Sequence, residues 1–269
     1  MTTHAREGAA RWLLLLGIVL VAINLRPTLA SVGPLVQDIR ADTGLSNAEL
    51  GLITTLTLIA FGVISLFASR VSRAIGLERA IGLALVLIGG GAAWRVSGPV
   101  SALYLGTAML GVGIALGNVL LPALAKRDFD SMAGPITSLY SSMMGLGATA
   151  AAGLSVPLAA SLGWRGSLGI WAAPAAVALV VWAPQMLGGP TSRNRRNGAG
   201  GIRRLARSPL AWQVALFMGL QSLTFYVVIA WIPDLLQSRG IGEATAGGLL
   251  AINQAAGIAG SALIPIWAG

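Results

Sequence analysis

The sequence has no cysteine and only one histidine, His4, which lies in a polar N-terminal stretch. Disulfides, thiolate metal sites and cysteine redox chemistry are therefore excluded. Charge is also scarce: charged residues make up 10% of the 269 residues, against about 25% in soluble domains. Hydrophobic residues make up 55%, and the mean hydropathy is +0.79. This composition is typical of an all-α polytopic membrane protein, because an irregular backbone or an open sheet cannot cross lipid.

Apolar segments of membrane-spanning length recur along the chain. Crossing the hydrocarbon core takes about 20 residues of helix. Eight segments approach or exceed that length: Trp12–Val36, Ala48–Phe67, Ala80–Arg95, Val100–Leu124, Pro135–Leu162, Ser167–Leu187, Trp212–Leu236 and Thr245–Ala268. The first segment is longer than a secretory signal and carries Arg26 in its middle, so we expect it to remain in the protein.

Basic residues divide the loops between these segments into two sets. One set holds thirteen of them: Arg6, Arg11, Arg70, Arg73, Arg79, Lys126, Arg127, Arg193, Arg195, Arg196, Arg203, Arg204 and Arg207. The alternate loops hold four: Arg40, Arg95, Arg165 and Arg239. An excess of Lys and Arg marks the cytoplasmic side, so the sequence predicts a multi-pass inner-membrane protein with a cytoplasmic N-terminus. This orientation accounts for the net charge of +9, and we expect no nucleic-acid partner.

The chain divides into two unequal blocks. We expect a six-helix N-terminal bundle at 1–187, a cytoplasmic basic linker at 188–208 and a partial C-terminal bundle of two helices at 209–269. The second block echoes the first, since Pro34 and Gln37 after the first span are matched by Pro233 and Gln237 after the seventh. Parallel repeats are one known transporter plan. The offset of 199 residues between Pro34 and Pro233 maps Arg26 onto Phe225.

Arg26 is the charged residue that the sequence places in the middle of a span. A charge at that depth costs about 2.5–3.5 kcal/mol and normally faces a protein interior or a watery cavity, with a partner there. The nine acidic residues all fall in loops, at span ends or in the N-terminal tail. A guanidinium has five donors and stays charged, so its natural complement is an anion. We interpret Arg26 as an anion clamp; a structural arginine bonded to backbone carbonyls is the alternative.

Four further polar residues of the spans are candidates for a solute site: Asn24, Asn118, Gln221 and Tyr226. Pro27 loosens the helix beside Asn24, and broken helices at mid-membrane are where transporters expose polar groups. Asn118 lies one turn before Pro122, while Gln221 and Tyr226 lie mid-span, where the repeat places them across from Arg26. For the two amides of Asn118 and Gln221, an interhelical hydrogen bond worth about 0.6 kcal/mol is an equal alternative; packing is the alternative for Tyr226.

Three stretches carry motifs of a known family. They are Asn24-Leu25-Arg26-Pro27 with Ser31, Gly33 and Pro34; Gly117-Asn118-Val119-Leu120-Leu121-Pro122 with Lys126-Arg127-Asp128-Phe129; and Gly219-Leu220-Gln221-Ser222 with Tyr226, Trp231 and Pro233. They resemble the cyanate and 2-nitroimidazole transporter branch of the major facilitator superfamily. The resemblance implies twelve helices in two bundles that rock around a central site. The superfamily signature at 69–76 lacks its acidic residue, and the chain has eight spans, so a truncated product is also an expectation.

These observations give one main function. We expect a secondary active or facilitative transporter of a small anionic or nitrogen-containing solute, cyanate-like or nitroimidazole-like, working as a monomer without cofactor or metal. The alternatives are a truncated membrane protein that does not transport, and an exporter of unrelated small molecules. Intramembrane serine proteolysis would need a base near the serine, so we expect no enzyme. No carboxylate lies mid-span to carry a proton, which leaves Glu49 or Asp234 near the outer face, further helices, or no coupling ion.

Overall fold

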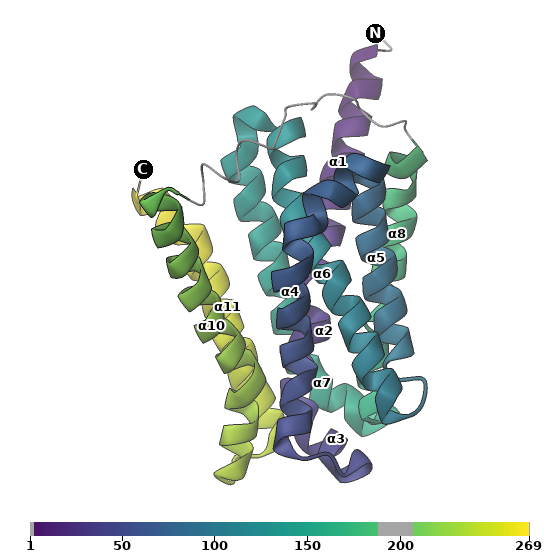
Figure 1. The fold of residues 1–269 in the computed structure, drawn as a ribbon, viewed down its shortest axis with the longest axis vertical. Coiled ribbons are helices and arrows are strands. Elements are labelled where there is room, and N and C mark those ends of the chain that lie inside the picture. The colour runs from purple at the N-terminus through teal and green to yellow at the C-terminus, as the bar shows by residue number, and fades with distance from the viewer. Residues whose placement is uncertain (1–2, 188–206, 269) are drawn as a thin grey trace.

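A computed structural model describes residues 3–187 and 207–268, and across these ranges the chain is helical, with no strand (Figure 1). The predicted all-α membrane fold is confirmed. The predicted linker at 188–208 lies almost wholly outside the described residues, so its boundaries stay a prediction.

The first span is broken rather than continuous. Its pieces are α1 (Thr3–Asn24), α2 (Pro27–Ala30), η1 (Gly33–Leu35) and α3 (Val36–Thr43). Pro27 has no N–H to continue the helix, and the Leu25 N–H instead closes a tight turn onto the Ala22 carbonyl at 3.1 Å. The loosening predicted at Pro27 is therefore a complete interruption, with Leu25 and Arg26 between two helices.

The other helices follow the predicted spans closely. They are α4 (Asn47–Ile75), α5 (Leu77–Trp94), α6 (Val100–Asp128), η2 (Asp130–Met132), α7 (Ala133–Gly169), α8 (Ala172–Leu187), α10 (Pro209–Ser238) and α11 (Glu243–Ala268). The chain turns sharply inside α7 at Gly163, which has φ +68°, so the fifth span ends at Leu162 as predicted. Among the described residues, six helical segments are long and apolar enough to cross a membrane, and α8 is a shorter apolar helix.

The helices of the first block pack through small residues. A Cβ atom added to Gly91 of α5 would lie 2.6 Å from the Gly106 carbonyl of α6, and one added to Gly113 would lie 2.6 Å from the Ala84 carbonyl. Backbones this close leave no room for side chains, as is common between membrane helices. On α8, Trp182 is fully buried and donates to the Glu78 carbonyl at 2.8 Å. These contacts join α5, α6 and α8 into one body.

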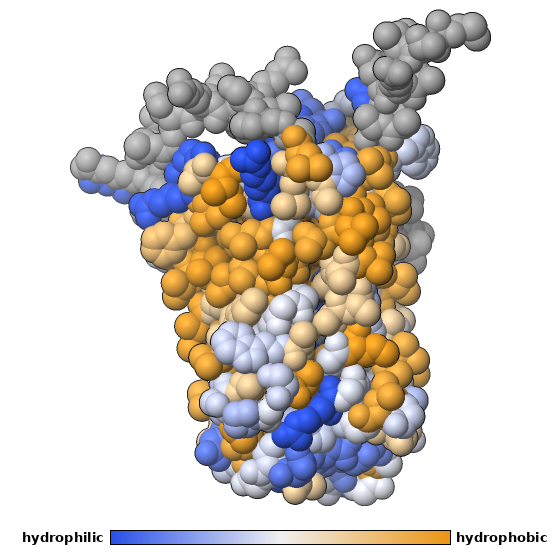
Figure 2. Space-filling view, turned by 90° about the vertical axis from the view of Figure 1, so that its right-hand side faces the viewer, coloured by the Kyte–Doolittle hydropathy of each residue, from blue (hydrophilic) through white to orange (hydrophobic). Residues whose placement is uncertain are grey.

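Two ends of the molecule can be distinguished. The basic end carries Arg11, Arg70, Arg73, Arg79, Lys126 and Arg127; the opposite end carries α3 and the turn between α10 and α11. Apolar side chains cover much of the face in Figure 2, while hydrophilic ones gather towards its two ends. This is the distribution expected of a protein that spans a bilayer.

Helix α10 meets the first block at the opposite end, whereas α11 also packs along α7. On α10, Tyr226, Ile229 and Pro233 are buried against the first block, whereas every residue from 212 to 224 is exposed. Figure 1 shows α10 diverging from α4 towards the basic end. Beside α10, the two halves are therefore in contact at the opposite end and apart at the basic end.

Candidate functional site

Arg26 lies in the break of the first span and contacts the seventh. It occupies the position before α2, and its side chain caps no helix. The guanidinium Cζ lies 4.5 Å from the centroid of the Phe225 ring and 5.7 Å from that of Tyr226. A cation placed over an aromatic face in this way gains about 0.5–2 kcal/mol, depending on how far it is desolvated. The contact joins α10 to the first block.

Two aromatic rings contact the guanidinium, and a third packs against one of them. Phe225 and Tyr226 of α10 meet edge to face at 5.2 Å, and Phe61 of α4 meets Tyr226 in the same manner at 5.9 Å. Tyr226 is buried, with 7% of its surface exposed, and the other two rings are half-buried. We call these three residues the aromatic wall. The wall gives the site an apolar lining drawn from both halves.

The Arg26 guanidinium has no counter-ion among the described residues. In the described part of the chain, the ion pairs within 4.0 Å are Arg40–Asp234, Arg127–Glu78, Arg127–Asp128 and Arg165–Asp42. The Nη1 atom of Arg26 is buried and has no hydrogen-bond partner among the described residues. A buried donor without a partner is costly, and more so when it is charged. Because Phe225 lies against the guanidinium, an acceptor would reach it from a side that this ring leaves free.

The Asn24 side chain is bound to backbone carbonyls of α1 and α8. Its amide is 3% exposed and donates to the carbonyls of Leu20 at 2.7 Å and of Pro174, in α8, at 3.2 Å. These bonds tie the end of α1 to α8. Asn24 is therefore bound to α1 and α8, whereas Arg26 contacts α10. A solute contact for Asn24 stays a prediction without support from these bonds.

The remaining predicted residues differ in how near they lie to Arg26. Tyr226 contacts it, as described above. Asn118 is half-buried and donates to Ile114 of its own helix at 2.9 Å. The residue before it, Gly117, packs against Leu25, since a Cβ there would lie 2.5 Å from the leucine side chain. Gln221 is exposed on the unpacked part of α10 and lies more than one turn from Tyr226.

A second buried arginine corrects the sequence analysis, which placed Arg95 in an outer loop. Arg95 is 1% exposed and donates from Nη1 to the Thr28 carbonyl at 2.8 Å and from Nη2 to the Leu168 carbonyl at 3.0 Å. Arg26 is therefore not the only charged residue inside the first block. Its place at the end of an apolar run gave no sign of burial, because span ends are where arginines normally reach water. Phe61 was also missed, since nothing distinguishes it from other apolar residues of α4.

Polar residues join the two halves at the opposite end. Gln37 donates to Asp234 at 2.5 Å, and Gln237 donates to the Pro34 carbonyl at 3.3 Å. Each half thus offers a glutamine to the region of the other half's proline, a contact that the sequence echo did not predict. Gly33 allows the approach, because a Cβ there would lie 2.5 Å from the Ile229 carbonyl. We call these residues the closing contact.

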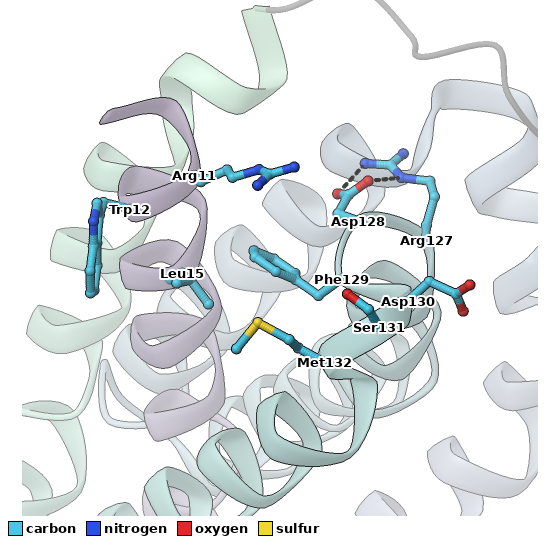
Figure 3. Close-up of a pocket in the computed structure, with 9 residues that line it drawn as sticks. All are labelled: Arg11, Trp12, Leu15, Arg127, Asp128, Phe129, Asp130, Ser131 and Met132. Atoms are coloured by element: carbon cyan, nitrogen blue, oxygen red, sulfur yellow. Dashed lines mark hydrogen bonds and ion pairs between the residues drawn. The ribbon is translucent and has the colours of Figure 1, made fainter. Parts of the chain in front are cut away.

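A separate hollow of about 520 Å³ lies at the basic end, between the start of α1 and the end of α6 (Figure 3). Arg11 and Arg127 line it together with Asp128 and Asp130. Arg127 is held by Asp128 at 2.7 Å and by Glu78 at 2.6 Å. The two acids balance the two arginines, so this hollow does not attract an anion. It lies many residues along α1 from Arg26 and is not the candidate solute site.

Comparison with known proteins assigns the family. Residues 10–269 match the sequence profile of the Major Facilitator Superfamily. The 2-nitroimidazole transporter of Escherichia coli (strain K12) is 42% identical over 97% of this chain and 67% of its own length. The cyanate transport protein CynX of the same organism is 33% identical over 95% of this chain and 66% of its own length. The chain thus spans about two thirds of the length of these relatives.

A solved structure supports the fold alone. The D-xylose-proton symporter superposes with a TM-score of 0.73 at 18% identity, covering 95% of this chain and 68% of that one. Since both comparisons point to the same architecture, the broken first span, Arg26 and the closing contact can be interpreted within it.

Proposed function

Because the chain belongs to the major facilitator superfamily, in the branch of the cyanate and 2-nitroimidazole transporters, we propose that it carries a small planar anion or nitrogen-containing solute across the inner membrane by alternating access. The relatives are transporters rather than enzymes, which supports the expectation of no catalytic activity. A monomer with a cytoplasmic N-terminus remains part of the proposal.

One observation supports the anionic substrate most directly. Arg26 is a charged residue within the helices, it has no acidic partner among the described residues, and its Nη1 is buried without a hydrogen bond. An anion would supply both the missing charge and the missing acceptor. Bidentate binding in the guanidinium plane suits flat carboxylate-like or nitrate-like groups, and a linear cyanate-like anion would accept through one end.

The aromatic wall refines the substrate class. Phe225 covers a face of the guanidinium, and Phe61 and Tyr226 make the neighbouring surface apolar. A small solute with a flat, weakly hydrated body and one anionic or polar edge fits this lining, because aromatic rings stack on such bodies while the guanidinium binds the edge. A strongly hydrated, many-hydroxyl solute would lose its hydration without finding partners.

The arrangement of the halves supports alternating access. Arg26 contacts α10 at the depth where this helix changes from buried to exposed, which is where α10 parts from the first block. With the basic end on the cytoplasmic side, this conformation is open inwards and shut outwards by the closing contact. Transport then requires Gln37 and Asp234 to separate while the halves approach each other at the basic end.

Glu49 and Asp234, the acidic residues considered for coupling transport to an ion, bind other groups of the protein in this conformation. Glu49 completes a capping box with Ser46, accepting from its backbone N–H at 2.8 Å. Asp234 accepts from Gln37 and lies 3.8 Å from Arg40. Glu49 therefore stabilises the start of α4, and Asp234 belongs to the closing contact. Facilitated diffusion or exchange is the form of transport that these contacts favour.

Binding of anions by the purified protein tests this function. Thermal unfolding in detergent would be followed with cyanate, nitrate, sulfate and neutral 2-nitroimidazole at matched ionic strength. We expect stabilisation by cyanate or nitrate that saturates, little effect of sulfate, and loss of the cyanate effect in Arg26→Gln. Equal stabilisation of both proteins by every salt would show a non-specific salt effect and contradict the proposal.

A further inference from the structure

Arg95 is the most deeply buried charged side chain in the described part of the molecule, and nothing neutralises it there. It is 1% exposed, and no acidic side chain of the described residues lies within 4.0 Å of it. Its two terminal nitrogens each donate to one backbone carbonyl. Burying an unpaired guanidinium is unfavourable, so this placement needs a reason in what those two carbonyls do.

The first carbonyl belongs to Thr28, inside the broken part of the first span. In a continuous helix the Val32 N–H would bond to it, but that N–H bonds to Leu29 at 3.2 Å instead. Arg95 Nη1 supplies a donor at 2.8 Å. The Arg95 side chain, at the end of α5, therefore helps to hold helix α2, which is only four residues long.

The second carbonyl belongs to Leu168, in the last turn of α7, where carbonyls have no partner within the helix. Arg95 thus joins two unpaired backbone groups from segments far apart in the sequence. Its own backbone is fixed, because a Cβ on Gly106 of α6 would lie 2.6 Å from the Arg95 Cα. The side chain forms a bridge from the end of α5 to a helix of four residues that also packs against α7.

Arg26 depends on the position of α2. Its carbonyl accepts from the N–H groups of Leu29 and Ala30, both at 3.1 Å, so it begins the short helix that contains Thr28. The backbone at Leu25 and Arg26 lies between two helices, outside the regular i to i+4 hydrogen bonds. The point to which the Arg26 guanidinium extends is therefore set by whatever holds α2.

We propose that Arg95 is a positioning residue for Arg26: by binding the Thr28 and Leu168 carbonyls, it holds α2 so that the Arg26 guanidinium lies on Phe225 and presents its free edge to the solute. The solute part rests on the proposed function; the positioning part does not. Lysine would keep the charge but lose the planar fork that reaches both carbonyls.

A double-mutant cycle tests the positioning without any ligand. Phe225→Leu and Arg95→Gln would be made separately and together, and the apparent melting temperature of each purified protein measured. If Arg95 sets the contact between Arg26 and Phe225, Phe225→Leu lowers the melting temperature in the unchanged protein and has less than half that effect in Arg95→Gln. Arg165→Gln serves as the control background, because this arginine lies at the same end, with 40% of its side chain exposed, and pairs with Asp42. Effects of Phe225→Leu that are equal in all backgrounds would overturn the inference.

Amide hydrogen exchange gives a local readout on the same samples. We expect exchange across 25–35 to rise more than tenfold in Arg95→Gln, to rise less in Arg95→Lys, and to stay unchanged in Arg165→Gln and in α4 of every variant. Arg95→Lys also serves in the cycle should Arg95→Gln fail to fold. Unchanged exchange across 25–35 would overturn the inference. A lack of anion binding by the unchanged protein would instead contradict the proposed function and leave this test intact.

Discussion

The guanidinium of Arg26 lies over the ring of Phe225, 4.5 Å from Cζ to the ring centroid, and this contact joins the broken part of the first span to α10. The offset of 199 residues between Pro34 and Pro233 in the sequence matches the same two residues to each other. A cation and a ring that the sequence echo matches therefore meet between α10 and the first block.

Replacement of Arg26 tests the anion clamp. Arg26→Lys keeps the charge but loses the bidentate fork, so anion affinity should fall at least tenfold. Arg26→Ala and Arg26→Gln should nearly abolish binding and uptake. All three should insert, because Arg26→Lys leaves the charge unchanged and the other two remove a buried charge and so relieve an insertion cost. Membrane abundance and uptake would be measured on the same samples, with exposed Arg73→Gln as control. Normal uptake per folded molecule of Arg26→Ala would contradict the role of Arg26 as an anion clamp.

Replacement of Phe225 tests the aromatic support of that arginine. Phe225→Leu keeps an apolar side chain but removes the ring face, worth about 1 kcal/mol, so the anion dissociation constant should rise about fivefold. Phe217→Leu is the matched control on the same helix, because Phe217 is 68% exposed. Anion titration of purified protein measures both. The same shift for the two variants would show that the ring over Arg26 has no special part.

Gly33 should be intolerant of a side chain. A Cβ there would lie 2.5 Å from the Ile229 carbonyl, so Gly33→Leu should hold the closing contact open. A reporter cysteine at Ala230, the only cysteine in that protein, should then react faster with an impermeant maleimide. Gly62→Leu is the control, because no atom lies within 4 Å of a Cβ at Gly62. Unchanged reactivity in Gly33→Leu would show that the contact shifts to accommodate the side chain.

Orientation is testable with single cysteines. Ala41 and Ser131 are both exposed, at the opposite end and the basic end respectively. In intact cells, Ala41→Cys should react with an impermeant thiol reagent and Ser131→Cys should not, until the membrane is permeabilised. The reverse pattern would place the basic end outside and overturn the inward-open interpretation.

Acidification should stabilise the folded protein through Glu243, at the start of α11. Partial burial, and then the charge of Asp38, raise the pKa of Glu243 above its ordinary value of 4.5. The folded protein therefore binds this proton more tightly than the unfolded chain does. The stability contribution is full below pH 4.5 and is lost as pH rises through the raised pKa. Glu243→Gln should flatten the dependence of the melting temperature on pH in that window. A dependence that is unchanged in this variant would assign the effect to another group.

Much of the fold could be predicted from residue patterns. The length of apolar runs fixes where helices cross, and Pro27 and Gly163 fix where they break, because these are local properties of the backbone. The pairing of Arg26 with the region of Tyr226 followed from the repeat. The exposed position of Gln221 could not be predicted from the repeat, since it depends on how far α10 tilts from the first block.

Other features could not be predicted, for a common reason. The burial of Arg95 depends on two unpaired carbonyls, 67 and 73 residues away along the chain, meeting at one point. The reciprocal bonds of Gln37 and Gln237 depend on the register between halves. Such arrangements are set by three-dimensional packing, and a pattern along the sequence indicates at most which residues are available.

The close approach of Gly33 to Ile229 is a point about which α10 can tilt. The contact lies near one end of this 30-residue helix, and about 20 residues, or about 30 Å at 1.5 Å per residue, extend from it towards the basic end. A tilt of about 5° at this fulcrum moves the far end of that arm by about 2.6 Å, given the same rise per residue. Displacements at the closing contact too small to change its hydrogen bonds are therefore enough to alter the width of the inward opening.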